Sequence, residues 1–178
     1  MSTAEAHGHD DHHEPGFLGK YVFSLDHKTI GKQFLFTTLF MFLIGGALAI
    51  LLRTKLAWPS SGMVKDSFNG EAFSVLTTMH ASVMIFFVII PMLVGAFGNF
   101  VIPLQIGARD MAFPVLNMLS YWVVFPAIII MMLGFVIGDY HSQAGWTSYP
   151  PLSSFLTYTG AIDWSKDWGQ TLWIVSVL

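Results

Sequence analysis

The chain has 178 residues, of which 54% are hydrophobic and only 11% are charged, and its mean hydropathy is +0.61. Soluble domains carry roughly 25% charged residues, so this composition excludes an ordinary soluble domain and indicates a membrane protein. A net charge of −3 with scattered Lys and Arg residues argues against a nucleic-acid partner, and the absence of cysteine leaves histidine to carry any soft-metal chemistry.

The first fifteen residues are mostly polar, and four histidines are interleaved there with acids: His7, His9, His12 and His13. Such a composition cannot bury enough apolar surface to fold alone, so residues 1–15 are predicted to form a disordered His-rich tail. Flexible tails of this kind usually lack a defined metal site. The chain does not open with the pattern of a cleavable signal peptide.

Three long apolar segments follow, and each is predicted to be a transmembrane helix: about 34–52, 73–102 and 112–138. The first segment contains 19 residues without a charge. As a helix these residues reach about 28 Å, close to the roughly 30 Å thickness of the hydrocarbon core. A turn at residues 107–110 is predicted to separate the second helix from the third.

The last apolar segment, 168–178, has eleven residues and is too short to cross a bilayer. It is therefore predicted to be the beginning of a fourth helix, in a chain that is a fragment or is truncated. The fold class expected for residues 16–178 is all-α: a polytopic transmembrane helix bundle with three complete helices and an incomplete fourth. Positive charges leave the orientation undecided, because four Lys or Arg residues fall on each side.

His80 is an ionisable side chain inside an apolar segment, where it is costly and is therefore a functional candidate by default. Its helical neighbours include Phe73, Leu76 and Phe87, an apolar and aromatic face that suits the plane of a porphyrin. Asn99 follows 19 residues later, about 28 Å along a helix, so the two lie near opposite membrane faces. Position alone leaves two interpretations open: haem or metal ligation, and a histidine held by an interhelical hydrogen bond.

Asn99, Asp110, Asn117 and Ser120 suggest a polar track that enters the membrane from the turn. The last three share one helix face if the third helix begins by Met111. Amides, a hydroxyl and an acid in one crevice suit a file of hydrogen-bonded water. The alternative is a capping acid together with interhelical amide bonds, which are common in helix bundles.

Arg53 and Trp146 each have an ordinary interpretation in a membrane protein. Arg53 ends the first predicted helix, where an arginine usually extends to the membrane surface, and its alternative is a partner for a buried acceptor. Trp146 belongs with Tyr149 to a loop that is typical of the interfacial aromatic belt.

Five motifs, in order along the chain, resemble subunit I of cytochrome c oxidase and its relatives in the haem-copper oxidase superfamily. They are LDHKTIG at 25–31, MHASVMIFF at 79–87, GNFVIPL at 98–104, GARDMAFP at 107–114 and WTSYPPL at 146–152. The resemblance covers the chain from about Phe23 to its end. It implies the N-terminal part of a larger, twelve-helix-type subunit.

This resemblance implies that His80 is one axial ligand of a low-spin haem, expected to be haem A, whose second histidine lies on a later helix. Arg53 would hydrogen-bond a substituent of that haem, and Trp146 would lie near the propionates of the oxygen-binding haem. The ligands of the oxygen-binding haem and of the copper would lie beyond Leu178. No catalytic residue of oxygen reduction is therefore expected here, and the chain alone is expected to be inactive.

The resemblance also implies a proton pathway. Asp110 would stand at its mouth, His27 near its entrance, and Asn99, Asn117 and Ser120 along the route. The N-terminus and Asp110 would then face the cytoplasm or matrix, in a bacterial cytoplasmic membrane or a mitochondrial inner membrane.

The activity implied is electron transfer from cytochrome c to oxygen, giving water and pumping protons. The implied partners are subunits of the II and III type, cytochrome c, oxygen and membrane lipid.

Four positions depart from the family pattern. Phe34 replaces a tyrosine that borders the proton pathway in many relatives. Lys55 replaces a glutamate that helps to bind a structural cation in some relatives, so that cation is not expected. Ala72 and Val75 replace a histidine and a glutamine of quinol-using relatives, which favours cytochrome c as the donor over the quinol alternative.

Two other classes of protein are alternatives. A haem-carrying membrane cytochrome without oxygen chemistry would share His80 but would need no polar track at Asp110. A secondary transporter would explain an intramembrane histidine and asparagine but not haem.

Overall fold

The computed structural model describes residues 16–59, 70–137, 142–150, 153 and 168–178. Within these ranges every regular element is helical and none is a strand. Three helices are long and apolar enough to cross a membrane: His27–Ala57, Ala72–Ile106 and Pro114–Leu133. The prediction of an all-α membrane bundle is therefore confirmed, whereas the predicted His-rich tail, residues 1–15, lies outside the described residues.

The first spanning helix, α1 (His27–Ala57), begins seven residues before the apolar segment from which it was predicted. Asp26 sets this beginning, because its carboxylate accepts hydrogen bonds from the Thr29 backbone N–H at 3.0 Å and from the Thr29 hydroxyl at 2.9 Å. A short π-helical turn, η1 (Leu18–Val22), precedes it. The helix therefore extends beyond the uncharged segment at both ends.

The second spanning helix changes its hydrogen-bonding pattern along its length. It comprises α3 (Gly70–Ser82), the π-helical segments η2 (Val83–Ile89) and η3 (Pro91–Phe97), and α4 (Gly98–Ile106). Pro91 has no N–H to donate, so the α-helical ladder cannot run unchanged through this point. Gly107 ends the helix in the left-handed region, at φ +69°, which a glycine adopts without steric cost.

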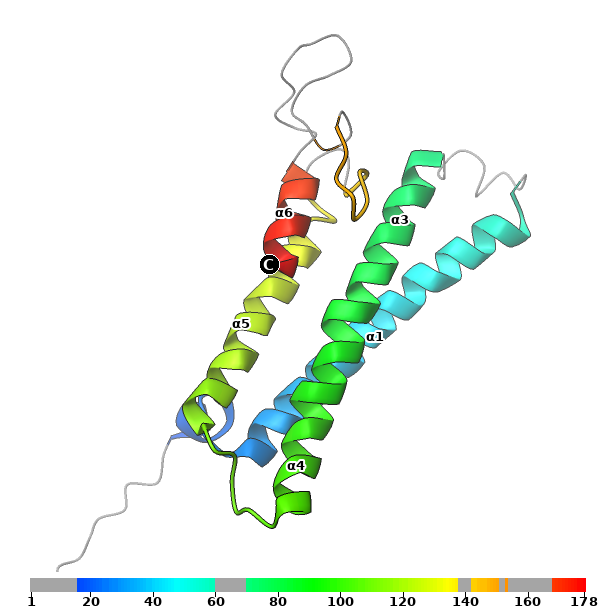
Figure 1. Ribbon diagram of the computed structural model, residues 1–178. Helices are drawn as coiled ribbons and strands as arrows, with labels where there is room; N and C mark the ends of the chain where they lie inside the picture. Colours follow the sequence, from blue (N-terminus) through cyan, green and yellow to red (C-terminus); the bar gives the residue numbers. More distant parts are fainter. Residues whose placement is uncertain (1–15, 60–69, 138–141, 151–152, 154–167) are drawn as a thin grey trace, which may run out of the picture.

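The third spanning helix, α5 (Pro114–Leu133), ends five residues before the predicted boundary. Pro114 occupies its first turn, where a missing N–H costs least. Helix α6 (Trp168–Val177) lies beside the C-terminal end of α5, as Figure 1 shows, and α1 crosses the second spanning helix obliquely. Helix α1 thus contacts both other spanning helices and organises the bundle.

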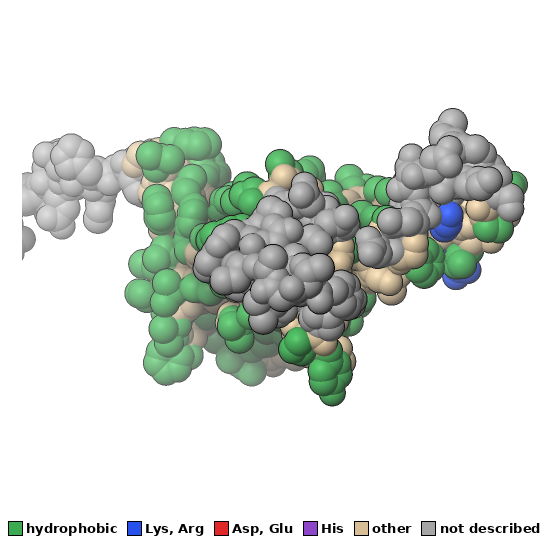
Figure 2. Space-filling view, turned by 90° about the horizontal axis from the view of Figure 1, so that it is seen from above, with side chains coloured by type: hydrophobic (Ala, Val, Ile, Leu, Met, Phe, Trp, Pro, Cys, Tyr) green, Lys and Arg blue, Asp and Glu red, His purple; other side chains and the backbone are tan. Residues whose placement is uncertain are grey.

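The packing of the described residues is apolar on the outside as well as inside. Many large apolar side chains are exposed, and Figure 2 shows them over most of the described surface visible from that side. The buried positions, in contrast, include several polar residues, and seven of those described are less than 5% exposed: His27, Thr38, Ser82, Asn99, Ser142, Gln170 and Ser176. A bundle that faces lipid on the outside and holds polar groups inside is the arrangement expected of spans with functional interiors.

Candidate functional site

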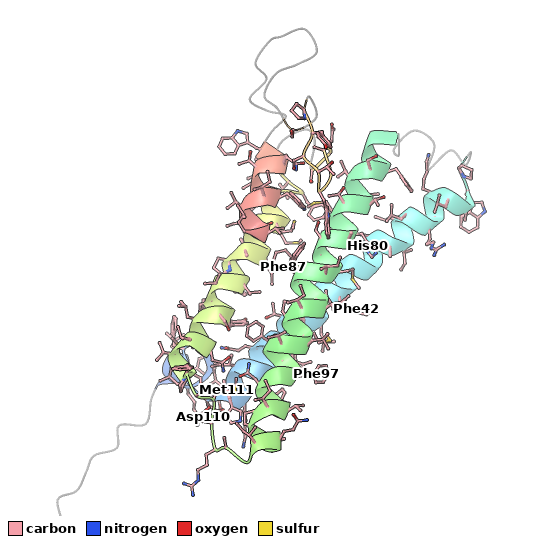
Figure 3. The ribbon with its side chains drawn as sticks, in the orientation of Figure 1. Phe42, His80, Phe87, Phe97, Asp110 and Met111 are labelled. Carbon is pink, nitrogen blue, oxygen red and sulfur yellow. The ribbon has the colours of Figure 1, made fainter. Side chains whose placement is uncertain are left out.

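The interior polar residues form two groups near opposite ends of the bundle. His80 lies in the upper half of the second spanning helix, and Asp110 lies in the turn at the other end of that helix, as Figure 3 shows. The two groups are separate sites, and each uses α1 as one wall.

His80 donates one hydrogen bond across the helix pair. Its Nδ1 lies 2.9 Å from the carbonyl oxygen of Gly45, on α1. A carbonyl oxygen can only accept, so Nδ1 carries a proton, and in the neutral imidazole Nε2 then has a lone pair. This arrangement is the one that orients a metal-ligating histidine, because a hydrogen bond holds one ring nitrogen while the other is free to bind a metal.

The bond to Gly45 confirms the interhelical hydrogen bond that was one of the two interpretations of His80, and ligation of a haem stays a prediction that this bond is compatible with. The histidine is held by an interhelical hydrogen bond, and the ring retains a nitrogen suited to a haem iron. Among the described residues no group of three or more His, Asp or Glu side chains gathers to hold a metal ion.

Only part of the apolar face predicted around His80 is available to a cofactor. Phe87 is buried in the core with Met79 and Trp173. Leu76 remains partly exposed on the side of the helix that bears His80. A planar group at His80 would therefore contact Leu76 and not the buried ring of Phe87.

Gly45 allows the close approach that brings α1 to His80. A Cβ atom at this position would lie 2.6 Å from the sulfur of Met84 and 3.3 Å from Cγ1 of Val83. The first contact is too short for a real Cβ atom, so the Met84 side chain would have to move, and the second is tight. The glycine therefore sets the distance that the His80 hydrogen bond spans.

The second group begins with His27 and Asp110, which are 83 residues apart in the sequence. His27 donates from Nδ1 to Oδ1 of Asp110 across 2.9 Å, and the same oxygen accepts the Met111 backbone N–H at 2.7 Å. The histidine is buried, while the carboxylate is 45% exposed. The pair joins the first residue of α1 to the turn before α5, with the acid open to the exterior.

Asp26 lies directly beside this pair and has a perturbed pKa. Partial burial acts to raise the pKa of its carboxyl, but the hydrogen bonds from Thr29 outweigh that effect and hold the pKa below the ordinary value. Asp26 therefore stays ionised as the cap of α1.

Asn99 and Asn117 form the second pair of this group. Nδ2 of Asn117 donates to Oδ1 of Asn99 across 2.5 Å, and Nδ2 of Asn99 donates to the Gly95 carbonyl at 2.6 Å. Asn99 is 2% exposed. The interhelical amide bond that was the alternative to a water track is therefore present, and it brings two of the four predicted track residues into contact.

The predicted common face for Asp110, Asn117 and Ser120 is wrong in one respect. Helix α5 begins at Pro114, not by Met111, so Asp110 lies in the preceding turn and faces His27 instead. Ser120 is exposed, and its hydroxyl donates to the Asn117 carbonyl of its own helix at 2.6 Å. The serine therefore does not join the pair of amides.

Arg53 and Trp146 occupy the end of the bundle that bears His80. Arg53 lies eight residues beyond Gly45 on α1, with an exposed side chain that lines a shallow cavity with Thr54 and Trp58. Trp146 is 49% exposed, and its ring contacts Phe86 at a centroid distance of 5.6 Å. Among the described residues no hydrogen bond joins Arg53 to His80.

Ser82 is a positioning residue that sequence reasoning missed. Its hydroxyl accepts hydrogen bonds from Nε1 of Trp146 at 3.2 Å and from Nε1 of Trp173 at 2.8 Å, and it donates to the Thr78 carbonyl at 2.8 Å. The residue is fully buried, two positions after His80. Ser82 is one of several hydroxyl residues in this helix, and the two indoles that bond to it come from distant segments, so the sequence alone did not single it out.

These features agree with comparisons to known proteins. Residues 29–178 match the family of cytochrome c and quinol oxidase polypeptide I, and the chain belongs to this family. The resemblance predicted from the five motifs is therefore confirmed. Together with the three helices long enough to cross a membrane, this makes the chain an integral membrane protein.

Named relatives include both branches of the family. Cytochrome c oxidase subunit 1 of Thermostichus vulcanus is 40% identical over 158 residues, covering 89% of this chain and 26% of that protein. The corresponding subunit of Synechocystis sp. is 43% identical with the same coverage. Probable quinol oxidase subunit 1 of Staphylococcus haemolyticus is 43% identical over 141 residues, covering 76% of this chain and 20% of that protein. The chain spans about a quarter of the length of its cytochrome c oxidase relatives.

Proposed function

We propose that this chain is the haem-ligating and proton-uptake part of the catalytic subunit of a terminal respiratory oxidase. The observation that carries the proposal is the hydrogen bond from His80 Nδ1 to Gly45, which orients Nε2 as a ligand in a chain of this family. The full subunit reduces oxygen to water, and its oxygen-binding haem and copper take their ligands from elsewhere in that subunit.

The residues of this chain hold one side of a low-spin haem, expected to be haem A. His80 would supply a nitrogen ligand to the iron, Arg53 would hydrogen-bond a substituent of this haem, and Trp146 would help to hold the oxygen-binding haem. When bound, the low-spin haem supplies one-electron transfer. The protein orients the His80 imidazole through its hydrogen bond to Gly45, and the side chain of Leu76 provides an apolar surface beside it.

Proton uptake is the second role. Asp110 takes protons from the cytoplasmic or matrix side, where its exposed carboxylate is held by His27. Asn99 and Asn117 then offer donors and acceptors without a fixed charge, so that water between the pairs can pass protons inward. Ser120 contributes at the edge of this route.

The electron donor is cytochrome c, with quinol as the alternative. A cytochrome c oxidase subunit and a quinol oxidase subunit are each 43% identical to the chain over the residues matched, so sequence identity does not distinguish the two donors. The side chain of Val75 is 6% exposed and packs in the core, so it offers no polar group to a quinol head. Subunits of the II and III type are the partners in a bacterial cytoplasmic or mitochondrial inner membrane.

Two variants of the full-length oxidase test this proposal. His80→Ala should remove the low-spin haem band from the reduced-minus-oxidised spectrum. Asp110→Asn should leave that spectrum unchanged but reduce proton pumping and oxygen consumption by at least tenfold.

Each rival function gives a different result. A membrane cytochrome that only carries electrons would keep its turnover in Asp110→Asn. A transporter would show no haem band even in the unsubstituted complex.

A further inference from the structure

The short turn η1, which precedes α1, carries exposed apolar side chains. Phe17, Leu18 and Tyr21 are 73%, 63% and 52% exposed. The ring centroids of Phe17 and Tyr21 are 5.1 Å apart, so these two residues share one side of the turn. Lys20 is also exposed, and its Nζ lies 5.8 Å from the centre of the Tyr21 ring. These four side chains form the η1 patch, which is apolar with a cation at its edge.

Two side chains of the bundle hold η1 by its last carbonyl groups. Nε2 of Gln33, on α1, donates to the carbonyl oxygens of Tyr21 at 2.6 Å and of Val22 at 3.0 Å. Nε1 of Trp122, on α5, donates to the Val22 carbonyl at 3.2 Å. The last carbonyls of a helical turn have no partner within it, and away from water they need one from elsewhere. These bonds therefore allow η1 to lie where little water reaches it.

The same contacts place η1 alongside the bundle and not beyond its end. Gln33 lies six residues after the first residue of α1, a rise of about 9 Å. Trp122 lies eight residues after the first residue of α5, a rise of about 12 Å, and the ring of Phe23 stacks on it at 5.0 Å. Figure 1 shows this segment, in dark blue, beside the N-terminal end of α5. Interfacial helices bury their apolar face to a similar depth, about 5–10 Å into the boundary of headgroups and acyl chains.

The chemistry of the η1 patch suits a phospholipid. Phe17 and Leu18 have no polar group and fit acyl chains, whereas a lysine at the membrane boundary extends its ammonium group to the headgroups. The described charged residues near this end of the bundle are four cations and two carboxylates, which favours a negatively charged membrane surface. They are Lys20, Lys28, Lys32 and Arg109, against Asp26 and Asp110.

We propose that residues 17–23 form an interfacial anchor, which binds phospholipid at the end of the bundle that bears Asp110. The apolar face of η1 contacts the acyl chains next to the headgroups, and Lys20 pairs with a headgroup phosphate. Gln33 holds the anchor at this depth through the two carbonyls. The inference rests on the membrane-spanning character of the chain and not on the proposed routes of electrons and protons.

The test measures the surroundings of the anchor in the full-length oxidase complex, placed in nanodiscs of phosphatidylcholine and phosphatidylglycerol. The chain has no cysteine, so Leu18→Cys can carry a nitroxide label, and the signal of the labelled unsubstituted complex is subtracted. Oxygen concentrates in lipid, whereas a water-soluble nickel chelate stays outside it. Relaxation of the Leu18→Cys label by oxygen should exceed its relaxation by the nickel chelate at least threefold.

Two further labelled positions calibrate this ratio of oxygen to nickel relaxation. Lys28→Cys lies in the first turn of α1 and is exposed, so its label should relax more with the nickel chelate. Lys20→Cys should give a ratio between those of Leu18→Cys and Lys28→Cys, because its side chain reaches the headgroups.

Gln33→Met tests how the anchor is held, because methionine has a similar length but no amide to donate. Added to Leu18→Cys, it should increase the mobility of the label and lower the ratio at least twofold, while the haem spectrum stays unchanged. Gln105→Met is the matched control, because Gln105 is exposed on α4. It should leave the mobility and the ratio as they were.

Two results would overturn the lipid contact. A label at Leu18→Cys that neither reagent reaches lies under protein, and the η1 patch would then be a subunit interface. A label that relaxes as Lys28→Cys does lies in water. If Gln33→Met changes neither mobility nor ratio, the role of Gln33 is wrong. The ratios do not depend on turnover, so they are the same whether or not the functions proposed for His80 and Asp110 hold.

Discussion

Nδ1 of His80 on α3 donates to the carbonyl oxygen of Gly45 on α1, so the helix that carries the proposed haem ligand is fixed by the backbone of its neighbour. A backbone carbonyl cannot be removed by substitution of a side chain. The distance between the helices, however, depends on the absence of a side chain at Gly45.

We expect Gly45→Ala to separate the two helices and to weaken the hydrogen bond on His80. Loss of the hydrogen-bond partner of a metal-ligating histidine typically lowers metal affinity about tenfold or more, so haem content after mild detergent washing should fall. Gly46→Ala is the matched control, because a Cβ there meets nothing within 4 Å. Equal haem content in the two variants would contradict the anchoring role of Gly45.

Ser82→Ala should destabilise the bundle more than its position in one helix suggests. The change leaves the indole N–H groups of Trp146 and Trp173 without their acceptor, and each unsatisfied buried donor costs about 1–3 kcal/mol. The more buried Trp173 should contribute the larger share. A lower thermal unfolding temperature of the complex would be the measured effect.

Ser74→Ala is the control for the serine. Ser74 lies on the same helix and makes the same kind of bond to the carbonyl four residues earlier, but it is exposed. Its unfolding temperature should match that of the unsubstituted protein. An equal loss in both variants would assign the effect to the helix and not to the indoles.

His27→Phe should slow proton uptake, because the Asp110 carboxylate loses the hydrogen bond that holds it at the mouth of the route. Misplacement of a reacting group by even 1 Å is expensive, so a several-fold loss of oxygen consumption is expected. Lys28→Gln alters an exposed neighbour and should have little effect. Normal turnover in His27→Phe would limit the pair to a structural role.

The cap of α1 gives a prediction about pH. Because the pKa of Asp26 is lowered on folding, its contribution to stability is present above the ordinary value of about 3.9 and is lost as the pH falls through the lowered value. Asp26→Ala should lose roughly 1 kcal/mol of local stability at neutral pH. Faster amide hydrogen exchange at residues 28–33 would report that loss.

Asp26→Asn separates capping from charge, because asparagine caps a helix about as well but does not titrate. In Asp26→Asn, the protection of the amides of residues 28–33 from hydrogen exchange should be close to that of the unsubstituted chain at neutral pH. This protection should not decrease as the pH is lowered. A parallel acid dependence in both proteins would place the titrating group elsewhere.

The sequence by itself determined the membrane character, the all-helical class and the family. Long uncharged segments leave the backbone no partners in lipid except those within a helix, so composition dictates both length and class. Membership followed from motifs that are local in sequence. Asp26 is a residue type that caps helices and could have marked the start of α1. The helix was predicted to begin later because Lys28 and Lys32 lie outside the uncharged segment.

Only the tertiary structure decided which side chains meet. His27 and Asp110 are 83 residues apart, and Thr37 and Tyr121 are 84 apart, so no spacing along one helix could pair them. Their contacts depend on how α1 crosses its neighbours, which close packing at Gly45 and Gly95 controls. Hydrogen bonds act over about 3 Å, whereas sequence periodicity specifies only a face of a helix.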